Sequence, residues 1–339
     1  MEVFTFKNEE KTNLEKLLQH SPNPYSKYME FKSYIELNVL PNISSRFQDF
    51  CKKIVESRKN NTDPVSLIKN CPLDAEIPLF NHDNPVMDKY EKKKTFISEA
   101  FLQLFNDLTE TPVLAYTTRN NGDFFHDVYA YTLYSNTQTQ KTDGELFLHN
   151  DRTAHPVRAD YLALLGMRCS KRNKIYTGYI HGTELLKYLS RETQKILREK
   201  YFCTPYDEYS KDSNDLQDVS HKHYILEEES CFRYYDTRTR PLEDAPIEAY
   251  RAILNLKDAF VKAKKERVII EKGELLSFPN QAGLHCRDII EIEDYQEAKD
   301  RWLLKTYSFR GTDYAEKFKD TFDAKIPYLI RDNSIINEF

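Results

Sequence analysis

The chain has 339 residues, enough for one large domain or two modest ones. Hydrophobic residues make up 40% of it and charged residues 30%, which excludes both a disordered chain and a membrane-embedded one. With 49 basic and 54 acidic residues the formal net charge is −5, which argues against a broad basic surface for nucleic acid.

The first third of the chain is predicted to be helical. Apolar residues recur at three- and four-residue steps over 13–20, 26–37, 44–57 and 91–108. Prolines and asparagines between 60 and 78 indicate an irregular stretch among these helices. We therefore expect residues 1–110 to form a mainly helical flank.

From about residue 113 the pattern changes to short runs rich in Tyr, Phe, Val and Thr. Such runs predict strands over 113–117, 127–134, 145–149, 161–168, 174–180, 268–271, 274–278 and 302–309. Helices are predicted over 183–201, in two pieces with Ser190 capping the second, and over 247–264. This order favours one antiparallel barrel or sandwich with helices packed outside and a long insertion near 203–245.

The sequence has no targeting or cross-linking signal. The first 16 residues lack the apolar run of a signal peptide, and the most apolar stretch, 161–167, is too short to span a bilayer. The six cysteines form no CxxC pair, so free thiols are expected. These features predict a cytoplasmic protein without a membrane anchor.

One histidine has a carboxylate two residues later, in Leu148-His149-Asn150-Asp151. Side chains at i and i+2 of a strand project from the same face, so His149 and Asp151 could grip one metal ion. Roughly one such pair arises by chance in a chain of this composition, so an ordinary surface-strand pair is the alternative.

Downstream residues would complete such a site. A facial triad of two histidines and one carboxylate needs a further histidine from a distant strand, and His285 fits that need. In the strand that begins near residue 301, alternation places Arg301, Leu303 and Lys305 on one face. An arginine there could clamp a dicarboxylate through two parallel hydrogen bonds.

Together these residues resemble the clavaminate synthase-like branch of the Fe(II)/2-oxoglutarate dioxygenases, which includes hydroxylases of free asparagine, arginine and lysine. The similarity extends over most of the chain. The segments that carry it are Pro72-Leu73-Asp74 with Ile77-Pro78, Asn121-Gly122-Asp123 with His126-Asp127-Val128, and Leu148-His149-Asn150-Asp151 with His155-Pro156 and Asp160-Tyr161.

The resemblance implies an α+β fold in a single domain, 1–339. Its core would be a double-stranded β-helix (a jelly-roll, cupin-like core) over 111–202 and 246–310, with the helical flank at 1–110 and a lid insertion at 203–245.

The resemblance also implies the ligands of the site. Fe(II) would be held by His149, Asp151 and His285, and the co-substrate 2-oxoglutarate by Arg301 and Thr177, with O2 as the oxidant. Several relatives carry Glu where Asp151 stands. A carboxylate at this position speaks against a halogenase, because similar halogenases have Gly or Ala there.

The segments 148–164, 280–288 and 302–306 are most similar to the free L-lysine 4-hydroxylases, which implies L-lysine as substrate, with C4 favoured over C3. Asp236 is then expected to receive the side-chain ammonium, with a salt bridge to a nearby arginine as the alternative, and Lys305 the α-carboxylate. Gln138 and Gln140 are expected to donate hydrogen bonds to the substrate's backbone-like end.

Two alternatives stay open on the sequence. One is the same oxygenation of arginine, ornithine or another polar amino acid. The other is a non-catalytic barrel that binds a metal and 2-oxoglutarate. Neither nucleic acid nor a membrane is expected as a partner, and the sequence does not indicate an oligomeric state.

Overall fold

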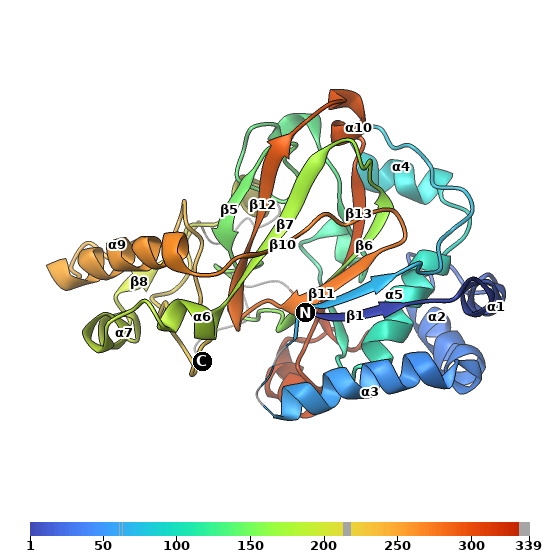
Figure 1. Ribbon diagram of the computed structural model, residues 1–339, viewed down its shortest axis with the longest axis horizontal. Helices are drawn as coiled ribbons and strands as arrows, with labels where there is room; N and C mark the ends of the chain where they lie inside the picture. The colour runs from blue at the N-terminus through green and yellow to red at the C-terminus, as the bar shows by residue number, and fades with distance from the viewer. Residues whose placement is uncertain (61, 63, 213–217, 332–339) are drawn as a thin grey trace.

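The computed structural model describes residues 1–60, 62, 64–212 and 218–331 (Figure 1). Two β-sheets form its centre, and helices cover the outer face of each. No helix among the described residues is long and apolar enough to cross a membrane.

The larger sheet has eight strands within the described chain. Its edge pairs β1–β2 and β3–β14 are parallel, and its central neighbours are antiparallel. In spatial order the strands are β1 (Glu2–Thr5), β2 (Ser66–Lys69), β11 (Leu275–Pro279), β6 (Tyr161–Arg168), β13 (Trp302–Ser308), β3 (Val113–Tyr116) and β14 (Leu329–Ile330), with β4 (His126–Val128) also on β13.

The smaller sheet has four antiparallel strands in the described chain. In spatial order they are β10 (Glu266–Val268), β7 (Lys174–His181), β12 (Gly283–Glu291) and β5 (Leu146–His149). The register of β12 on β5 sets His285 directly opposite His149. Neighbouring strands of this sheet therefore bring together two histidines that are far apart in the sequence.

Alternation along β6 shows how the layers pack. Leu162 and Leu164 face the smaller sheet, in one buried cluster with Tyr179 of β7. Ala163 and Leu165 face the opposite way, toward the amino-terminal helices. The two sheets thus pack face to face, and side chains that point between them share one interior.

The amino-terminal helices cover the outer face of the larger sheet (Figure 1). They are α1 (Asn8–Leu18), α2 (Tyr28–Tyr34) with a π-helical turn (Ile35–Val39), α3 (Ser45–Lys59) and α5 (Ile97–Leu108), while α4 (Pro85–Lys92) precedes α5.

The prediction of one continuous helix over 91–108 is wrong at the start of that range, because α4 ends at Lys92 and α5 begins only at Ile97. The Asp74 carboxylate explains the break. It accepts hydrogen bonds from the backbone N–H groups of Ile97 (3.0 Å) and Ser98 (3.3 Å), and so caps α5 from a distant segment.

A second set of helices covers the outer face of the smaller sheet, where Leu148, Ile180 and Leu284 are buried against them. These are α6 (Gly182–Leu186), α7 (Arg191–Leu197) and α9 (Ile247–Lys262). The predicted cap is confirmed, since the Ser190 hydroxyl accepts from Thr193 N at 3.1 Å. Two short helices, α10 (Tyr295–Lys299) and α11 (Thr312–Ala315), flank β13 in the sequence.

The insertion at 203–245 contains little regular structure where it is described. It includes α8 (Glu208–Asp212), and β8 (Phe202–Cys203) pairs with β9 (Arg240–Pro241) across its base. Residues 213–217 of the expected lid and 332–339 of the expected domain lie outside the described residues.

The strand expected over 127–134 is also wrong beyond Val128. β4 pairs with β13 over three residues only, and the chain then leaves the sheet, where the ring of Tyr129 stacks on that of His82. The pattern of aromatic residues that suggested a strand therefore reflects packing against the irregular segment before α4.

Candidate metal centre and its two cavities

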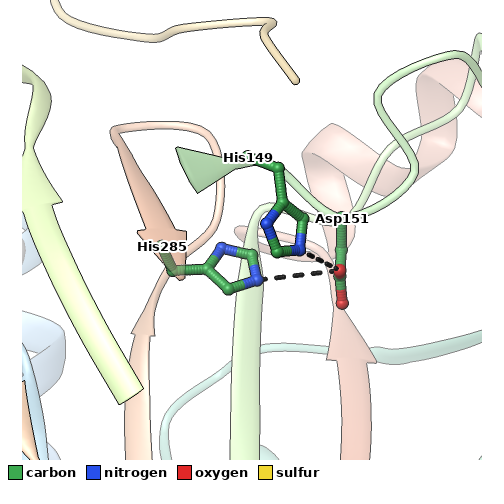
Figure 2. Close-up of side chains that lie close together, drawn as sticks. All are labelled: His149, Asp151 and His285. Atoms are coloured by element: carbon green, nitrogen blue, oxygen red, sulfur yellow. Dashed lines mark ion pairs between the residues drawn. The ribbon is translucent and has the colours of Figure 1, made fainter. Parts of the chain in front are cut away.

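Three buried side chains meet at the end of β5. His149 ends that strand, His285 lies opposite it on β12, and Asp151 follows in the turn after β5. The Nε2 atoms of His149 and His285 lie 3.4 and 3.6 Å from the same Asp151 Oδ1 (Figure 2). The ligand atoms of all three residues lie within 4.8 Å of one another. The structure thus brings together the three metal ligands expected from the sequence.

The protonation states of this cluster suit a divalent metal. His149 Nδ1 lies 2.7 Å from the Phe147 carbonyl oxygen, which assigns its proton to Nδ1 and leaves the Nε2 lone pair facing Asp151. Burial, with His149 close by, lowers the pKa of His285 to about 4. Burial alone would raise the pKa of Asp151, but the Lys305 ammonium beside it holds that pKa well below its usual value. Two imidazoles and one carboxylate form the donor set of a non-heme Fe(II) site.

Lys305 fixes the second oxygen of the Asp151 carboxylate. Its Nζ donates to Asp151 Oδ2 at 2.5 Å, to Gln140 Oε1 at 2.5 Å and to the Tyr307 hydroxyl at 2.8 Å. The other oxygen, Oδ1, therefore faces the Nε2 atoms of the two imidazoles. The structure gives Lys305 an anionic partner within the cluster, in addition to the role expected from the sequence.

A cavity of about 450 Å³ lies behind the cluster, between the two sheets. Leu162, Leu164 and Leu303 give it apolar walls, and Thr177 and Arg301 supply polar groups. Within the described chain the Arg301 guanidinium has no hydrogen bond or ion pair, although burial lowers its pKa. This inner cavity suits a short dicarboxylate whose far end meets a guanidinium.

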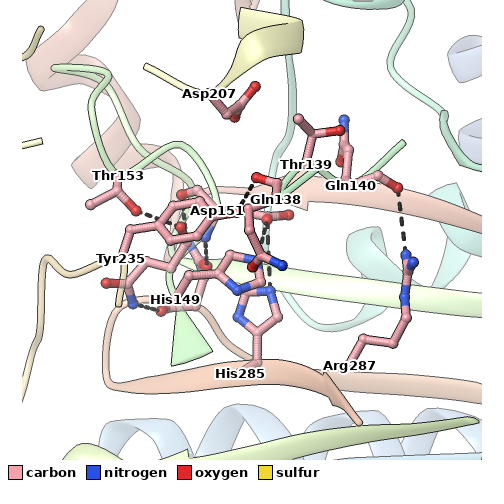
Figure 3. A network of polar contacts seen from close by, with 12 residues as sticks. Gln138, Thr139, Gln140, His149, Asp151, Thr153, Asp207, Tyr235, His285 and Arg287 are labelled. Carbon is pink, nitrogen blue, oxygen red and sulfur yellow. Dashed lines mark hydrogen bonds and ion pairs between the residues drawn. The ribbon is translucent and has the colours of Figure 1, made fainter. Parts of the chain in front are cut away.

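A second arginine, Arg287, also reaches the inner cavity from β12, two residues after His285. Its Nη1 donates to the carbonyl oxygens of Thr142 (2.7 Å) and Gly144 (3.1 Å), and burial lowers its pKa to about 9. Figure 3 shows its guanidinium reaching the Gln140 carbonyl oxygen (3.5 Å). Because loop carbonyls already hold Arg287, Arg301 is the guanidinium left for a ligand.

A separate cavity of about 480 Å³ lies on the other side of Asp151. It shares Gln140, His149 and Asp151 with the inner cavity, so the cluster stands in the wall between the two. This outer cavity opens toward the insertion, and Arg119, Arg152, Tyr206, Asp207 and Tyr235 line it. Figure 3 shows Asp207 facing the cluster from the insertion.

Tyr235 joins the insertion to the metal strand. It forms an antiparallel bridge with His149, and its ring stacks on that imidazole with centroids 4.9 Å apart. Its hydroxyl donates to the Gln138 carbonyl oxygen (Figure 3).

Two predicted substrate contacts lie away from the cluster. Residues 234–236 are extended beside β5, so Tyr235 faces His149 and Asp236 points to the opposite side. There Asp236 pairs with Lys257 at 2.9 Å and accepts from the Tyr234 hydroxyl, whereas the sequence suggested arginine partners. The Gln138 side chain is bound to the backbone at the start of β5, donating to Glu145 O (2.9 Å) just before the strand and accepting from Phe147 N (3.2 Å) within it. Gln140, by contrast, lines both cavities.

Sequence reasoning missed several residues of the outer cavity. Arg119 and Asp207 come from distant loops and carry no local signal. Arg152 had one signal, since it directly follows a candidate metal ligand, and Tyr235 had another, since it adjoins Asp236 in an extended segment.

No family model and no curated protein matches the sequence. Solved structures match it over nearly its whole length. An asparagine oxygenase in complex with Fe(II), 2S,3S-3-hydroxyasparagine and succinate has a TM-score of 0.79 and 18% identity, covering 98% of this chain and 99% of that one. The non-heme iron oxygenase OrfP in complex with Fe and alpha-ketoglutaric acid has a TM-score of 0.72 and 17% identity, covering 97% and 99%. OrfP in complex with Fe, succinate and (3S)-hydroxy-L-Arg has a TM-score of 0.75 and 17% identity, covering 97% and 100%.

The chain has the fold of these non-heme iron oxygenases. Its mixture of helices and a large mixed sheet agrees with the α+β class expected from the sequence.

Proposed function

We propose that this protein is an Fe(II)/2-oxoglutarate-dependent hydroxylase of a free amino acid. One observation carries the proposal: His149, Asp151 and His285 converge where two cavities meet, and His149 and Asp151 line both. This arrangement allows a co-substrate on one side and a substrate on the other to reach one metal ion. Solved proteins of the same fold contain Fe with alpha-ketoglutaric acid, or Fe with succinate and a hydroxylated amino acid.

Each part of the site has a role in this proposal. His149, Asp151 and His285 would hold Fe(II), while Arg301 and Thr177 would bind 2-oxoglutarate in the inner cavity. When bound, Fe(II) with 2-oxoglutarate and O2 supplies the oxidising power to hydroxylate an unactivated C–H bond, with release of succinate and CO2. The leucines of the inner cavity exclude water, and Lys305 orients Asp151. We interpret the facing sheets as a jelly-roll core and 203–245 as a lid, within one domain.

L-Lysine, with C4 favoured over C3, is the substrate candidate that the sequence resemblance implies, and arginine, ornithine or another polar amino acid are the alternatives. Gln140, which lines both cavities, and Lys305, which lines the inner one, remain proposed contacts of the amino-acid end. Asp236, proposed for a lysine ammonium, does not line the outer cavity, and Asp207, which does, lies 3.5 Å from Arg119. A substrate panel therefore has to include acids and amides as well as bases.

The metal ligands can be tested without any substrate. Anaerobic addition of Fe(II) and 2-oxoglutarate is expected to give the weak visible charge-transfer band of a bidentate keto acid. His149→Ala and His285→Ala should abolish the band, while the exposed His221→Ala should keep it. A band that persists in both ligand variants would refute the assignment.

Turnover separates an enzyme from a non-catalytic barrel. The protein is incubated with Fe(II), 2-oxoglutarate, air and single amino acids, and succinate and product mass are measured. A hydroxylase releases succinate in step with a product heavier by one oxygen atom. Binding of 2-oxoglutarate without substrate-triggered succinate would instead favour the sensing barrel.

A further inference from the structure

Two guanidinium groups in the outer cavity have unused hydrogen-bond donors. Arg119 is only 4% exposed, and its Nη2 contacts Asp207 (3.5 Å) and the Ser210 hydroxyl. Within the described part of the chain, the buried Nε and Nη1 of Arg119 have no partner, nor do the buried Nε and Nη2 of Arg152. In arginine, Nε and Nη2 form one edge of the planar group, the edge that binds a carboxylate through two parallel hydrogen bonds.

Arg152 is held in place without an acidic partner. Its backbone has φ of 61°, a left-handed conformation that non-glycine residues rarely adopt and that clusters at functional sites. Its guanidinium lies over the buried Tyr116 ring, 4.2 Å from the centroid. Stacking on an aromatic face positions the cation and leaves its donor edge unoccupied.

The charges around the outer cavity do not balance. Asp151 pairs with Lys305 at 2.5 Å, and Asp207, which lies 3.5 Å from Arg119, is the other acid in a lining that contains two guanidiniums. Fe(II) and the dianion of 2-oxoglutarate would cancel each other. The lining of the outer cavity therefore keeps one uncompensated positive charge, apart from that of Arg301 in the inner cavity, and burial makes it costly.

Whether a substrate compensates this positive charge depends on the substrate's own net charge. A lysine zwitterion would add a second positive charge, and a neutral amino acid would leave the first one in place. An amino acid with a side-chain carboxylate carries one net negative charge and would compensate it.

We infer that the substrate is an acidic amino acid, whose side-chain carboxylate is received by the donor edge of Arg152 with Arg119 beside it. This inference rests on the proposed function and deepens it by naming the substrate class. It replaces the expected anionic pocket for an ammonium group with a cationic pocket for a carboxylate. Arg152 and Arg119 are then the residues that determine specificity.

The test is a calorimetric titration of anaerobic protein loaded with Fe(II) and 2-oxoglutarate, so that the inner cavity is filled. L-Aspartate, L-glutamate and L-lysine are titrated separately. At least one acid is expected to bind about 100-fold more tightly than lysine. Arg152→Gln should weaken binding of that acid about 10- to 100-fold, while Lys257→Gln, which removes one cation from α9 outside the cavity, should leave it unchanged.

Lysine binding as tightly as both acids would overturn the inference, as would an unchanged affinity in Arg152→Gln. Both results leave the hydroxylase proposal standing if the charge-transfer band forms. If no band forms, the hydroxylase proposal fails, and the titration is repeated on metal-free protein. Loss of acid binding in Arg152→Gln but not in Arg301→Gln then supports the cationic pocket, and the reverse pattern overturns it.

Discussion

Two asparagines hold the turn that carries Asp151. Asn280 accepts from Asp151 N (2.8 Å) through Oδ1 and donates through Nδ2 to the carbonyl oxygens of Asp151 (3.2 Å) and Ala159 (2.9 Å). Asn150 donates to Asn280 O and Gly283 O and accepts from Tyr234 N. Both amides are buried, so the metal turn depends on a fully satisfied polar network.

Asn280→Asp is expected to weaken this network although the two side chains have the same shape. A carboxylate cannot donate, so it would face two carbonyl oxygens that lose their hydrogen bonds. We expect the free energy of unfolding to fall by about 2–5 kcal/mol, measured by urea denaturation, and Fe(II) affinity to fall with it. The exposed Asn255→Asp on α9 is the control, and equal effects of the two changes would contradict this account.

Lys141 makes the stability of the folded protein depend on pH. Its ammonium is fully buried, donates to the Asp127 carbonyl oxygen at 2.7 Å and lies over the Tyr131 ring. Burial lowers the pKa of Lys141 to about 7, whereas an unfolded lysine titrates near ~10.4. Between these values the unfolded chain binds more protons, so raising the pH favours the folded state.

We expect Lys141 to contribute about 2 kcal/mol of added stability between pH 7 and pH 9. Urea unfolding of the wild type and of Lys141→Met at both pH values measures it. From pH 7 to pH 9, the free energy of unfolding of the wild type should rise by this amount more than that of the variant. Parallel pH profiles for the two proteins would show that Lys141 titrates normally.

At the scale of single elements, β12 depends on one close approach. A Cβ on Gly283 would lie 2.5 Å from the Ile180 carbonyl oxygen of β7 and would overlap the Tyr179 hydroxyl. Backbone cannot yield to such a contact, so the strand that carries His285 would have to shift.

Gly283→Ala should therefore lower the free energy of unfolding by about 1–3 kcal/mol and weaken Fe(II) binding. Gly144→Ala is the matched control, because its Cβ would meet only the Thr142 hydroxyl, at 3.5 Å. Thermal unfolding and anaerobic Fe(II) titration of both variants check this. If Gly283→Ala changed neither the unfolding temperature nor the Fe(II) affinity, β12 would have room to accommodate the added methyl group.

The elements also show what sequence patterns can predict. β6, β7 and α9 were expected close to their observed bounds, because their apolar residues repeat over eight or more positions. β1 and β2 span four residues each, too few for a period to appear, and neither was predicted.

The same limits apply to the site. His149 and Asp151 were paired from the sequence by the i to i+2 rule for a strand, although β5 ends at His149 and Asp151 lies in the turn that follows. The position of Asp236 on the far side of residues 234–236 could not be predicted, because composition does not tell which face of an extended segment points inward. Arg119 and Asp207 were missed because only tertiary packing brings their loops to Asp151.

Across the whole molecule, a bound metal would link His149 and His285 of the smaller sheet to the turn after β5. An ion that binds only the folded state stabilises that state by mass action. Fe(II) at 100 times its Kd should therefore raise the free energy of unfolding by about 2.7 kcal/mol. Anaerobic thermal melts should show a Tm several degrees higher with Fe(II). A chelator should reverse the shift, and His149→Ala should lack it. An equal shift in that variant would locate the stabilising ion elsewhere.

The bridge between Tyr235 and His149 has a consequence for attempts to trim the protein. β5 lies at the end of the smaller sheet in the described chain, and residues 234–236 supply the backbone partners of its last residues. Deleting 203–245 to obtain a more open enzyme would leave those N–H and C=O groups of β5 without hydrogen-bond partners. An exposed strand edge of this kind pairs with strands of other molecules. The shortened protein should precipitate or form fibrils rather than accept bulkier substrates.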